Sequence, residues 1–286
     1  MSLLRNWKQA LKAQRSQWRA AWARQFGGYG PPELLKALLG MGIGPGSCVM
    51  LHSSFSSANG FRGTIPELID TFVEAVGPQG HLMMVSLPYR SASIDWLQSG
   101  RTFDVRRTPS MMGMVSEVFR RRDGVLRSLH PTHPILVHGP RAAEIIASHP
   151  DCLHPCGPGS PFAWLLELDG RSVFFNVPID MFTFFHYLEH HVSAQLPFPL
   201  YTDVPFDAPV VDASGQRRTV RTYAFARDAI QRRRPERLYD ELRRRGLVAQ
   251  VRVGASELLA VSVRDALACT DDLQRQGRLF YDMPQA

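Results

Sequence analysis

The fold prediction starts from Ser172-Val-Phe-Phe-Asn-Val-Pro178 and the segment that follows it, Thr183-Phe-Phe-His186-Tyr-Leu-Glu189-His190-His191. The first stretch is an apolar run typical of a buried strand, and the second predicts a helix that begins where this strand ends. Such strand ends form the edge of an α/β sheet, where functional sites usually lie. The sequence therefore predicts a strand–helix unit with a site at its junction.

A histidine and a carboxylate stand three residues apart in this predicted helix. Residues at this spacing share one helix face, so Glu189 can hold the ring of His186. A carboxylate in that place fixes the tautomer of the ring and supports its cationic form, as a general base requires. The alternative is that both are ordinary surface residues of a helix.

Residues 32–195 alternate between helix-like and strand-like segments. Strands are predicted over 47–51, 81–87 and 135–138, and helices over 33–39, 65–76, 111–121, 141–148 and 161–167. This alternation predicts a layered α/β fold. Residues 200–222 and 247–263 are strand-rich and flank a charged helical stretch, so residues 200–286 form either an antiparallel addition or a small subdomain. We expect one α/β domain over residues 31–286.

Composition restricts the class of protein. The chain has 286 residues, of which 44% are apolar and 21% charged, which is typical of a globular domain with a sizeable core. No apolar run reaches the roughly 20 residues of a membrane span, and no signal-type core stands at the start, so a cytoplasmic protein is expected. The cysteines at positions 48, 152, 156 and 269 lack zinc or redox spacing, which indicates packing roles.

The net charge of +7 is concentrated near the N-terminus. Residues 1–26 contain six Lys or Arg and no acidic residue, and Trp7, Leu11, Trp18 and Trp22 recur at mostly helical spacing. We therefore predict a basic amphipathic helix over residues 1–30. Such a helix can bind the anionic inner face of a membrane. Packing on its own domain or on a second subunit, as in a homodimer, is an equal alternative. No nucleic-acid-binding module accompanies the helix, and no nucleic-acid partner is expected.

A loop of small residues follows the predicted strand 47–51. It reads His52-Ser-Ser-Phe-Ser-Ser-Ala-Asn-Gly60 and leads to Thr64-Ile-Pro-Glu67, a capping box that starts a helix. Free backbone N–H groups in such a loop can hold a pyrophosphate. The loop lacks the Walker and dinucleotide patterns, so an ordinary βα turn is the alternative.

Two histidine pairs have spacings that resemble metal sites. His130 and His133 have Pro131 between them, and His186 and His190 stand four residues apart without the glutamate that follows the first histidine of a metalloprotease motif. We predict no metal site.

Six short motifs in order resemble the antibiotic N-acetyltransferase family typified by aminoglycoside 3-N-acetyltransferases. They are His-Ser-Ser-Phe-Ser-Ser (52–57), Phe-Asp (103–104), Thr-Pro-Ser-x-Met-Gly (108–113), Arg-Ser-x-His-Pro (127–131), Gly-Ser-Pro (159–161) and Thr-x-x-His-x-x-Glu (183–189). The resemblance covers residues 47–192. It implies the layered α/β acyltransferase fold of that family, with a strand-containing C-terminal part, and transfer of an acetyl group from acetyl-CoA to an amine.

The resemblance also implies site residues. His186 would be the general base and Glu189 its support. Coenzyme A would contact His52, Ser53, Ser54, Phe55, Ser56, Ser57, Thr108, Ser110, Ser128 and His130. The absence of a Gly-x-Ser-x-Gly nucleophile motif favours direct transfer over an acyl-enzyme.

The acceptor is where this chain departs from the family pattern. Thr132-His133-Pro134 follows the fourth motif, and an aromatic run, 174–185, replaces a segment with more glycine. A basic protein repels a polycationic aminoglycoside, so we favour a biosynthetic amino-sugar acceptor in a nucleotide-linked or lipid-linked glycan precursor. Asp95, Asp104 and Asp180 are the candidates for contacting its amine. The alternative function is a non-catalytic, membrane-associated scaffold of a glycan-assembly complex.

Overall fold

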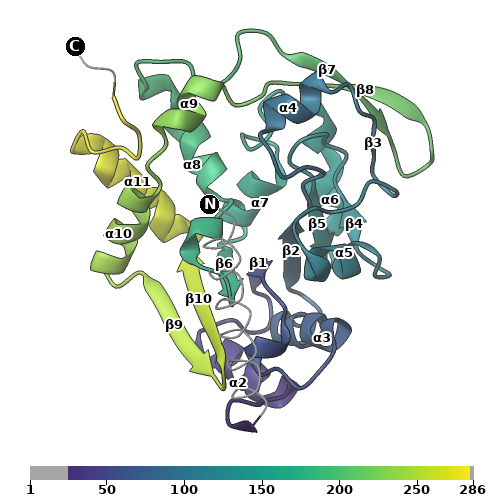
Figure 1. Ribbon diagram of the computed structural model, residues 1–286, viewed down its shortest axis with the longest axis vertical. Coiled ribbons are helices and arrows are strands. Elements are labelled where there is room, and N and C mark those ends of the chain that lie inside the picture. Colours follow the sequence, from purple (N-terminus) through teal and green to yellow (C-terminus); the bar gives the residue numbers. More distant parts are fainter. Residues whose placement is uncertain (1–24, 284–286) are drawn as a thin grey trace, which may run out of the picture.

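The computed structural model describes residues 25–283, and within them seven strands form one sheet in the order β4-β5-β2-β1-β6-β10-β9 (Figure 1). Their bounds are β1 Cys48–Ser53, β2 His81–Val85, β4 Leu126–Arg127, β5 Ile135–His138, β6 Arg171–Phe175, β9 Val248–Val253 and β10 Ser256–Ser262. Strand β1 is parallel to both β2 and β6. The carboxyl ends of these three strands therefore meet at one edge of the sheet.

Helices cover both faces of the sheet, because its central strands are buried on both sides. One face packs against α2 Pro31–Gly40, α3 Ile65–Val76 and α5 Met114–Arg120. The other packs against α6 Ala142–Ala147, α7 Pro161–Glu167, α8 Phe185–His191, α10 Glu236–Arg244 and α11 Val263–Arg275. Successive residues of β1 alternate between the faces, with Met50 in one core cluster and Leu51 in the other. The predicted layered α/β fold is confirmed.

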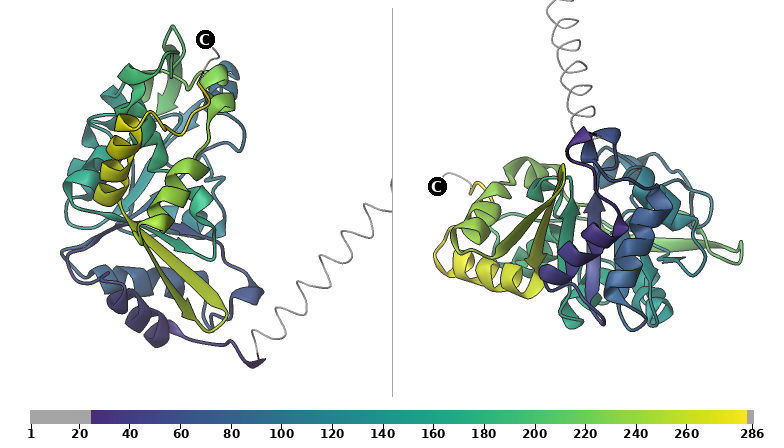
Figure 2. Two further views of the ribbon diagram at one scale, coloured as in Figure 1. Left: turned by 90° about the vertical axis from the view of Figure 1, so that its left-hand side faces the viewer. Right: turned by 90° about the horizontal axis from the view of Figure 1, so that it is seen from below.

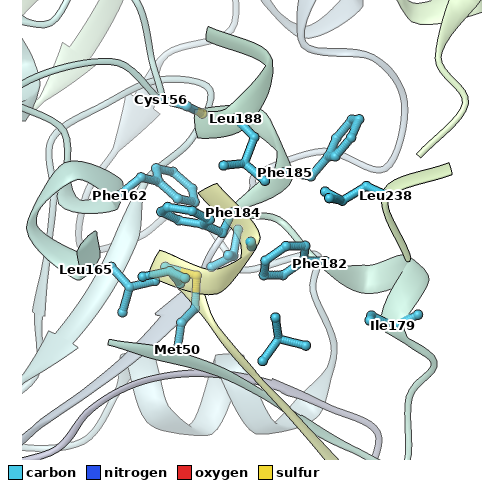
Figure 3. Close-up of a cluster of buried hydrophobic side chains, with 14 of the residues drawn as sticks. Met50, Cys156, Phe162, Leu165, Ile179, Phe182, Phe184, Phe185, Leu188 and Leu238 are labelled. Atoms are coloured by element: carbon cyan, nitrogen blue, oxygen red, sulfur yellow. The ribbon is translucent and has the colours of Figure 1, made fainter. Parts of the chain in front are cut away.

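Helix α8 rests on an apolar core that fixes its position. Phe182, Phe184, Phe185 and Leu188 point into this cluster, where they meet Phe162 of α7 (Figure 3). All five side chains are buried. A helix held by this many buried aromatic groups presents its remaining side chains in a fixed direction.

Several predicted elements match the structure closely. The predicted helix 65–76 is α3, and its capping box is present, since Glu67 N–H donates to Thr64 Oγ1 and the Glu67 carboxylate accepts from Thr64 N–H. Helix α5 begins three residues later than predicted, because Gly113 stands before it with a φ of 107° that continues no helix. Helix α11 has no counterpart among the predicted elements.

The C-terminal third contributes to two different sheets. Strands β7 Phe206–Val211 and β8 Arg217–Thr222 form a three-stranded sheet with β3 Phe103–Asp104. Strand β10 instead pairs antiparallel with β6, so the β9–β10 hairpin extends the main sheet, with α2 beside it (Figure 2). Two short helices, α4 Ser93–Gln98 and α9 Arg227–Arg232, and 3-10 turns at Ser57–Asn59, His149–Asp151, Ile179–Met181 and Ser193–Gln195 complete the elements.

Two predictions concern the relation to a membrane. Residues 1–24, which make up most of the predicted basic helix, lie outside the described residues. Within residues 25–283, no helix has both the length and the apolar character that a membrane span requires.

Candidate active site

The His186–Glu189 contact predicted from spacing is present in α8. His186 Nδ1 lies 2.7 Å from Glu189 Oε2. The Glu189 side chain is 0% exposed and that of His186 is 22% exposed, so the carboxylate lies inside and the ring reaches the surface. With Nδ1–H donated to the carboxylate, Nε2 is the nitrogen left to accept a proton. This is the geometry of a histidine base with an orienting acid.

Two residues that the sequence analysis did not single out complete the setting of Glu189. Arg233 Nε donates to Glu189 Oε1 at 2.5 Å, and the Tyr281 hydroxyl donates to the same oxygen. Burial alone would raise the pKa of the Glu189 carboxyl, but the Arg233 charge and the hydrogen bond from His186 outweigh it, and the net shift is downward. Glu189 therefore stays ionised although it is buried.

Arginines hold the segment that carries Tyr281. Arg234 N–H donates to the Phe280 carbonyl, and Arg237 Nη1 donates to the carbonyls of Leu279 and Tyr281. Asp282 forms ion pairs with both of these arginines. The chain after α11 is thereby fixed against the start of α10, and this places the Tyr281 hydroxyl on Glu189.

Removing that hydroxyl tests its contribution. Tyr281→Phe deletes one of three hydrogen bonds to the Glu189 carboxylate and leaves the ring in place. We expect a fall in kcat of roughly two- to tenfold, in line with about 0.5–1.5 kcal/mol for one hydrogen bond, and a shift of the low-pH limb of the kcat/KM profile. Wild-type activity with an unchanged pH profile would contradict a role for Tyr281 in positioning Glu189.

The wall beside His186 is aromatic and contains a second histidine. The centroid of the His186 ring lies 5.5 Å from that of His133 and 5.1 Å from that of Phe225. Arg233 also stacks on Phe225, with its guanidinium carbon 4.7 Å from the ring centre. Burial lowers the pKa of His133 well below its ordinary value, so this ring is neutral and adds no repulsion to a protonated His186.

Ser128 and His130, both predicted to contact coenzyme A, lie fully buried. Ser128 Oγ accepts from Ile135 N–H and donates to His149 Nδ1, and His149 Nε2–H donates to the Pro155 carbonyl. The His130 ring stacks on His149 with 4.4 Å between centroids. These two side chains have no exposed surface, and their contacts support the loop before β5.

Because of its buried histidines, we expect the folded protein to lose stability in acid. Burial lowers the pKa of His149 to about 4 and of His52 to about 3. In the unfolded chain each takes up a proton near pH 6.5, so stability is complete above that pH and falls as the pH drops toward 4. Between its folded and its unfolded pKa, each such histidine lowers the free energy of unfolding by about 1.4 kcal/mol for each unit by which the pH falls.

The urea midpoint of unfolding, measured at several pH values between 8 and 4.5, gives this slope. His149→Gln should reduce the slope in that range, whereas His191→Gln, which changes a surface partner of Asp271, should not. A midpoint that stays constant from pH 6.5 to 4.5 would show that these rings do not remain neutral in the folded protein.

The predicted coenzyme loop begins at the carboxyl end of β1. His52 is buried and stacks on Phe174, whereas Ser53 and Phe55 are half-buried and Ser54 and Ser56 are exposed. Ser54 N–H donates to the Phe175 carbonyl, which ties the loop to β6. Ser57 starts a 3-10 turn, and its side chain lies outside what the structure describes. The loop thus lies at the sheet edge formed by β1 and β6.

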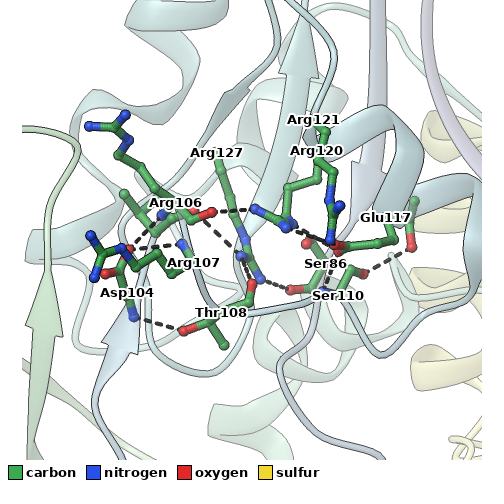
Figure 4. A network of polar contacts seen from close by, with 12 residues as sticks. Ser86, Asp104, Arg106, Arg107, Thr108, Ser110, Glu117, Arg120, Arg121 and Arg127 are labelled. Atoms are coloured by element: carbon green, nitrogen blue, oxygen red, sulfur yellow. Dashed lines mark hydrogen bonds and ion pairs between the residues drawn. The ribbon is translucent and has the colours of Figure 1, made fainter.

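Thr108 and Ser110 belong to a polar network around Arg127 (Figure 4). Arg127 donates to the carbonyls of Thr108 and Ser86, while Thr108 Oγ1 accepts from Asp104 N–H. Ser110 N–H donates to Glu117, and its hydroxyl bonds that of Ser116 at 2.9 Å. These contacts stabilise the turn before α5 and engage the polar atoms for which a coenzyme contact was predicted.

The three aspartates predicted to contact an amine lie in different parts of the fold. Asp95 accepts from Ala92 N–H at the start of α4 and pairs with Arg227 at 2.5 Å. Asp104 accepts the N–H groups of Arg106 and Arg107. Asp180 is exposed in the turn Ile179–Met181. The structure therefore does not bring these carboxylates together into one acidic pocket.

The fold and the His186–Glu189 contact define a layered α/β protein with a histidine–carboxylate pair beside the edge of its sheet. Residues 50–275 match the family model described as aminoglycoside 3-N-acetyltransferase, so the chain belongs to that family. The predicted family resemblance is confirmed.

Individual relatives agree with this assignment. Aminoglycoside N(3)-acetyltransferase IV of Salmonella sp. is 35% identical over 168 residues, which span 58% of this chain and only 60% of the relative. Among solved structures, a mutant of aminoglycoside acetyltransferase AAC(3)-IVa in complex with a gentamicin is 28% identical, with a TM-score of 0.70 over 90% of this chain and 93% of that one. The binary structure of AAC-IIIb with CoASH shares the fold at 21% identity, with a TM-score of 0.69 over 90% and 99%.

Proposed function

We propose that this protein is an acetyl-CoA-dependent N-acetyltransferase that modifies an amino group of an amino sugar, with His186 as general base. The observation that carries the proposal is the buried carboxylate of Glu189, which Arg233 keeps ionised and which bonds His186 Nδ1. Membership of a family of N-acetyltransferases supports it. So does the shared fold of a structure solved with CoASH.

The residues of the coenzyme loop fit the proposed donor. The backbone N–H groups of Phe55 and Ser56 have no acceptor within the described part of the chain, and both follow β1 at the sheet edge. Such groups suit pyrophosphate oxygens. Bound acetyl-CoA would supply the acetyl group as an activated thioester.

The chain's own residues perform the proton transfer. An amine is largely protonated at neutral pH, so it first loses one proton to the solvent, and His186 Nε2 then removes a second proton as the neutral nitrogen attacks the thioester carbonyl. The new C–N bond forms as the C–S bond breaks, and the proton taken by His186 is available to the departing thiolate. Glu189 stabilises the imidazolium formed in this step.

Calorimetry with acetyl-CoA tests donor binding. We expect micromolar affinity for the wild-type protein and a loss of at least tenfold in Ser54→Trp, which places an indole in the proposed coenzyme loop. Ser214→Trp, in the turn between β7 and β8, is the matched surface control. No binding by the wild-type protein at millimolar acetyl-CoA would refute the donor assignment.

For the acceptor we propose an amino sugar that carries an anionic group, as in a nucleotide-linked or lipid-linked glycan precursor. A cavity of about 550 Å³ between the Asp104 turn and the β7–β8 hairpin has three arginines and two aspartates in its lining, namely Arg106, Arg107, Arg217, Asp104 and Asp212. Within residues 25–283, Arg107 and Arg217 form no ion pair. Arginines of this kind suit phosphate groups and repel a polycation.

A comparison of acceptors distinguishes the two classes. UDP-linked 4-amino sugars and gentamicin would be offered at equal concentration, with release of free thiol as the signal. We expect turnover of the anionic acceptor and a rise in its KM in Arg107→Gln/Arg217→Gln. Turnover of gentamicin alone would assign the protein to antibiotic modification and refute a biosynthetic acceptor.

We further propose that residues 1–26 attach the protein to anionic lipid, on the evidence of their charge and tryptophan spacing. Co-sedimentation with vesicles of phosphatidylglycerol, compared with vesicles of phosphatidylcholine, tests this. Equal partition to both, together with a dimeric mass in light scattering, would favour a homodimer contact.

A further inference from the structure

A narrow cavity of about 210 Å³ opens at the carboxyl ends of β1 and β2. Three methionines line it, namely Met84 near the end of β2, Met112 before α5 and Met181 in the turn after β6. Methionine side chains are flexible and polarisable, so together they form an apolar wall that adjusts its shape. We call this cavity the methionine slot.

The methionine slot carries no charge. The described residues that line it include no Lys, Arg, Asp or Glu, and its one titratable group, His52, stays neutral because burial lowers its pKa to about 3. Phosphate and ammonium groups would be desolvated there without a counter-charge. The slot therefore suits neither the pyrophosphate of the donor nor the amine of the acceptor, but an apolar group.

The methionine slot touches both parts of the candidate active site. Its lining includes Ser53, at the start of the proposed coenzyme loop, and Thr183, three residues before His186. We propose that the slot receives the acyl chain of the donor thioester and that chains longer than acetyl fit it. This inference rests on the proposed acyltransferase function.

The volume supports the longer chain. A water-sized group occupies about 30 Å³ in a liquid, so a cavity of 210 Å³ has room for roughly seven such groups. An acetyl group has only three non-hydrogen atoms. A butyryl or hexanoyl chain fills the remaining space and gains burial against the methionines.

Binding measured in a His186→Ala background tests the slot without turnover. We expect hexanoyl-CoA to bind at least tenfold more tightly than coenzyme A, and Met112→Trp, which narrows the slot, to abolish this difference. Met114→Trp is the matched control, because Met114 is two residues away, 67% exposed and not part of the slot. Unfolding curves of each variant establish that it is folded.

Turnover provides the second readout. In the wild-type background, Met112→Trp should lower the ratio of the hexanoyl transfer rate to the acetyl transfer rate at least tenfold. Met114→Trp should keep the wild-type ratio. Acetyl transfer by the wild-type protein without any use or tighter binding of longer chains would overturn the inference and leave the proposed function standing. Absence of transfer from every acyl donor would overturn both.

Discussion

His186→Ala is expected to lower kcat/KM for acetyl transfer by roughly 10² to 10⁴, the usual contribution of a general base. The variant removes the ring whose Nδ1 bonds Glu189 and whose Nε2 would accept the proton of the amine. Since the His186 ring is not itself in the apolar core, folding should be retained. The measurement is the rate of thiol release at saturating donor, with thermal unfolding as a check on the fold.

The control for this variant lies on the same helix. His191→Ala removes a histidine whose side chain is 38% exposed and pairs with Asp271 at the surface. It should keep at least half of the wild-type rate. Equal rates for both variants would show that His186 is not the base, and the scaffold alternative would then gain support if acetyl-CoA also failed to bind.

Arg233→Met is expected to have the largest effect on stability. The variant removes the charge partner of Glu189, whose side chain is 0% exposed. Breaking a buried ion pair on one side typically costs about 3–5 kcal/mol, because the remaining charge is left uncompensated. Activity should also fall, since a protonated Glu189 no longer supports a cationic His186.

The contribution of Glu189 to the pH dependence of stability should change sign in this variant. In the wild-type protein the pKa of Glu189 is lowered, so its contribution is complete above about pH 4.5 and is lost as the pH falls through its folded value. Without Arg233 the burial of Glu189 raises its pKa above that of the unfolded chain, and the Glu189 contribution should then fall as the pH rises, so that the stability difference between variant and wild type widens.

Urea unfolding between pH 4 and pH 8 measures this change. Arg243→Met is the matched control, because Arg243 forms an exposed pair with Asp240 on α10 and is expected to be worth less than about 1 kcal/mol. Arg233→Lys should recover part of the loss. If Arg233→Met were as stable as Arg243→Met, the ion pair with Glu189 would not be holding the site.

The parts of the site that the sequence predicts are local in the chain. His186 and Glu189 are three residues apart, so helical geometry alone brings them together, and the structure confirms the contact. Thr64 and Glu67 form their capping box for the same reason. Regular periodicity likewise predicts most of the helices and strands of the sheet.

The partners of Glu189 are distant in the chain and carry no local signal. Arg233 is 44 residues away and Tyr281 is 92 residues away. Each follows from the way in which the residues after β8 fold back over α8. A buried carboxylate charge needs an opposite charge or hydrogen-bond donors nearby. That need is the one hint from the sequence that an arginine lies near Glu189.

Local patterns along the chain suffice to predict the layered α/β class, the order of the strands and helices around the site, and the His–Glu spacing, because each of these depends on residues a few positions apart. The folded chain is needed to show that Ser128 and His130 are buried, that Asp95 and Asp104 are held by other groups, and that Arg233 and Tyr281 surround Glu189. Burial and charge pairing depend on which distant segments pack together, and periodicity along the chain carries no record of that packing.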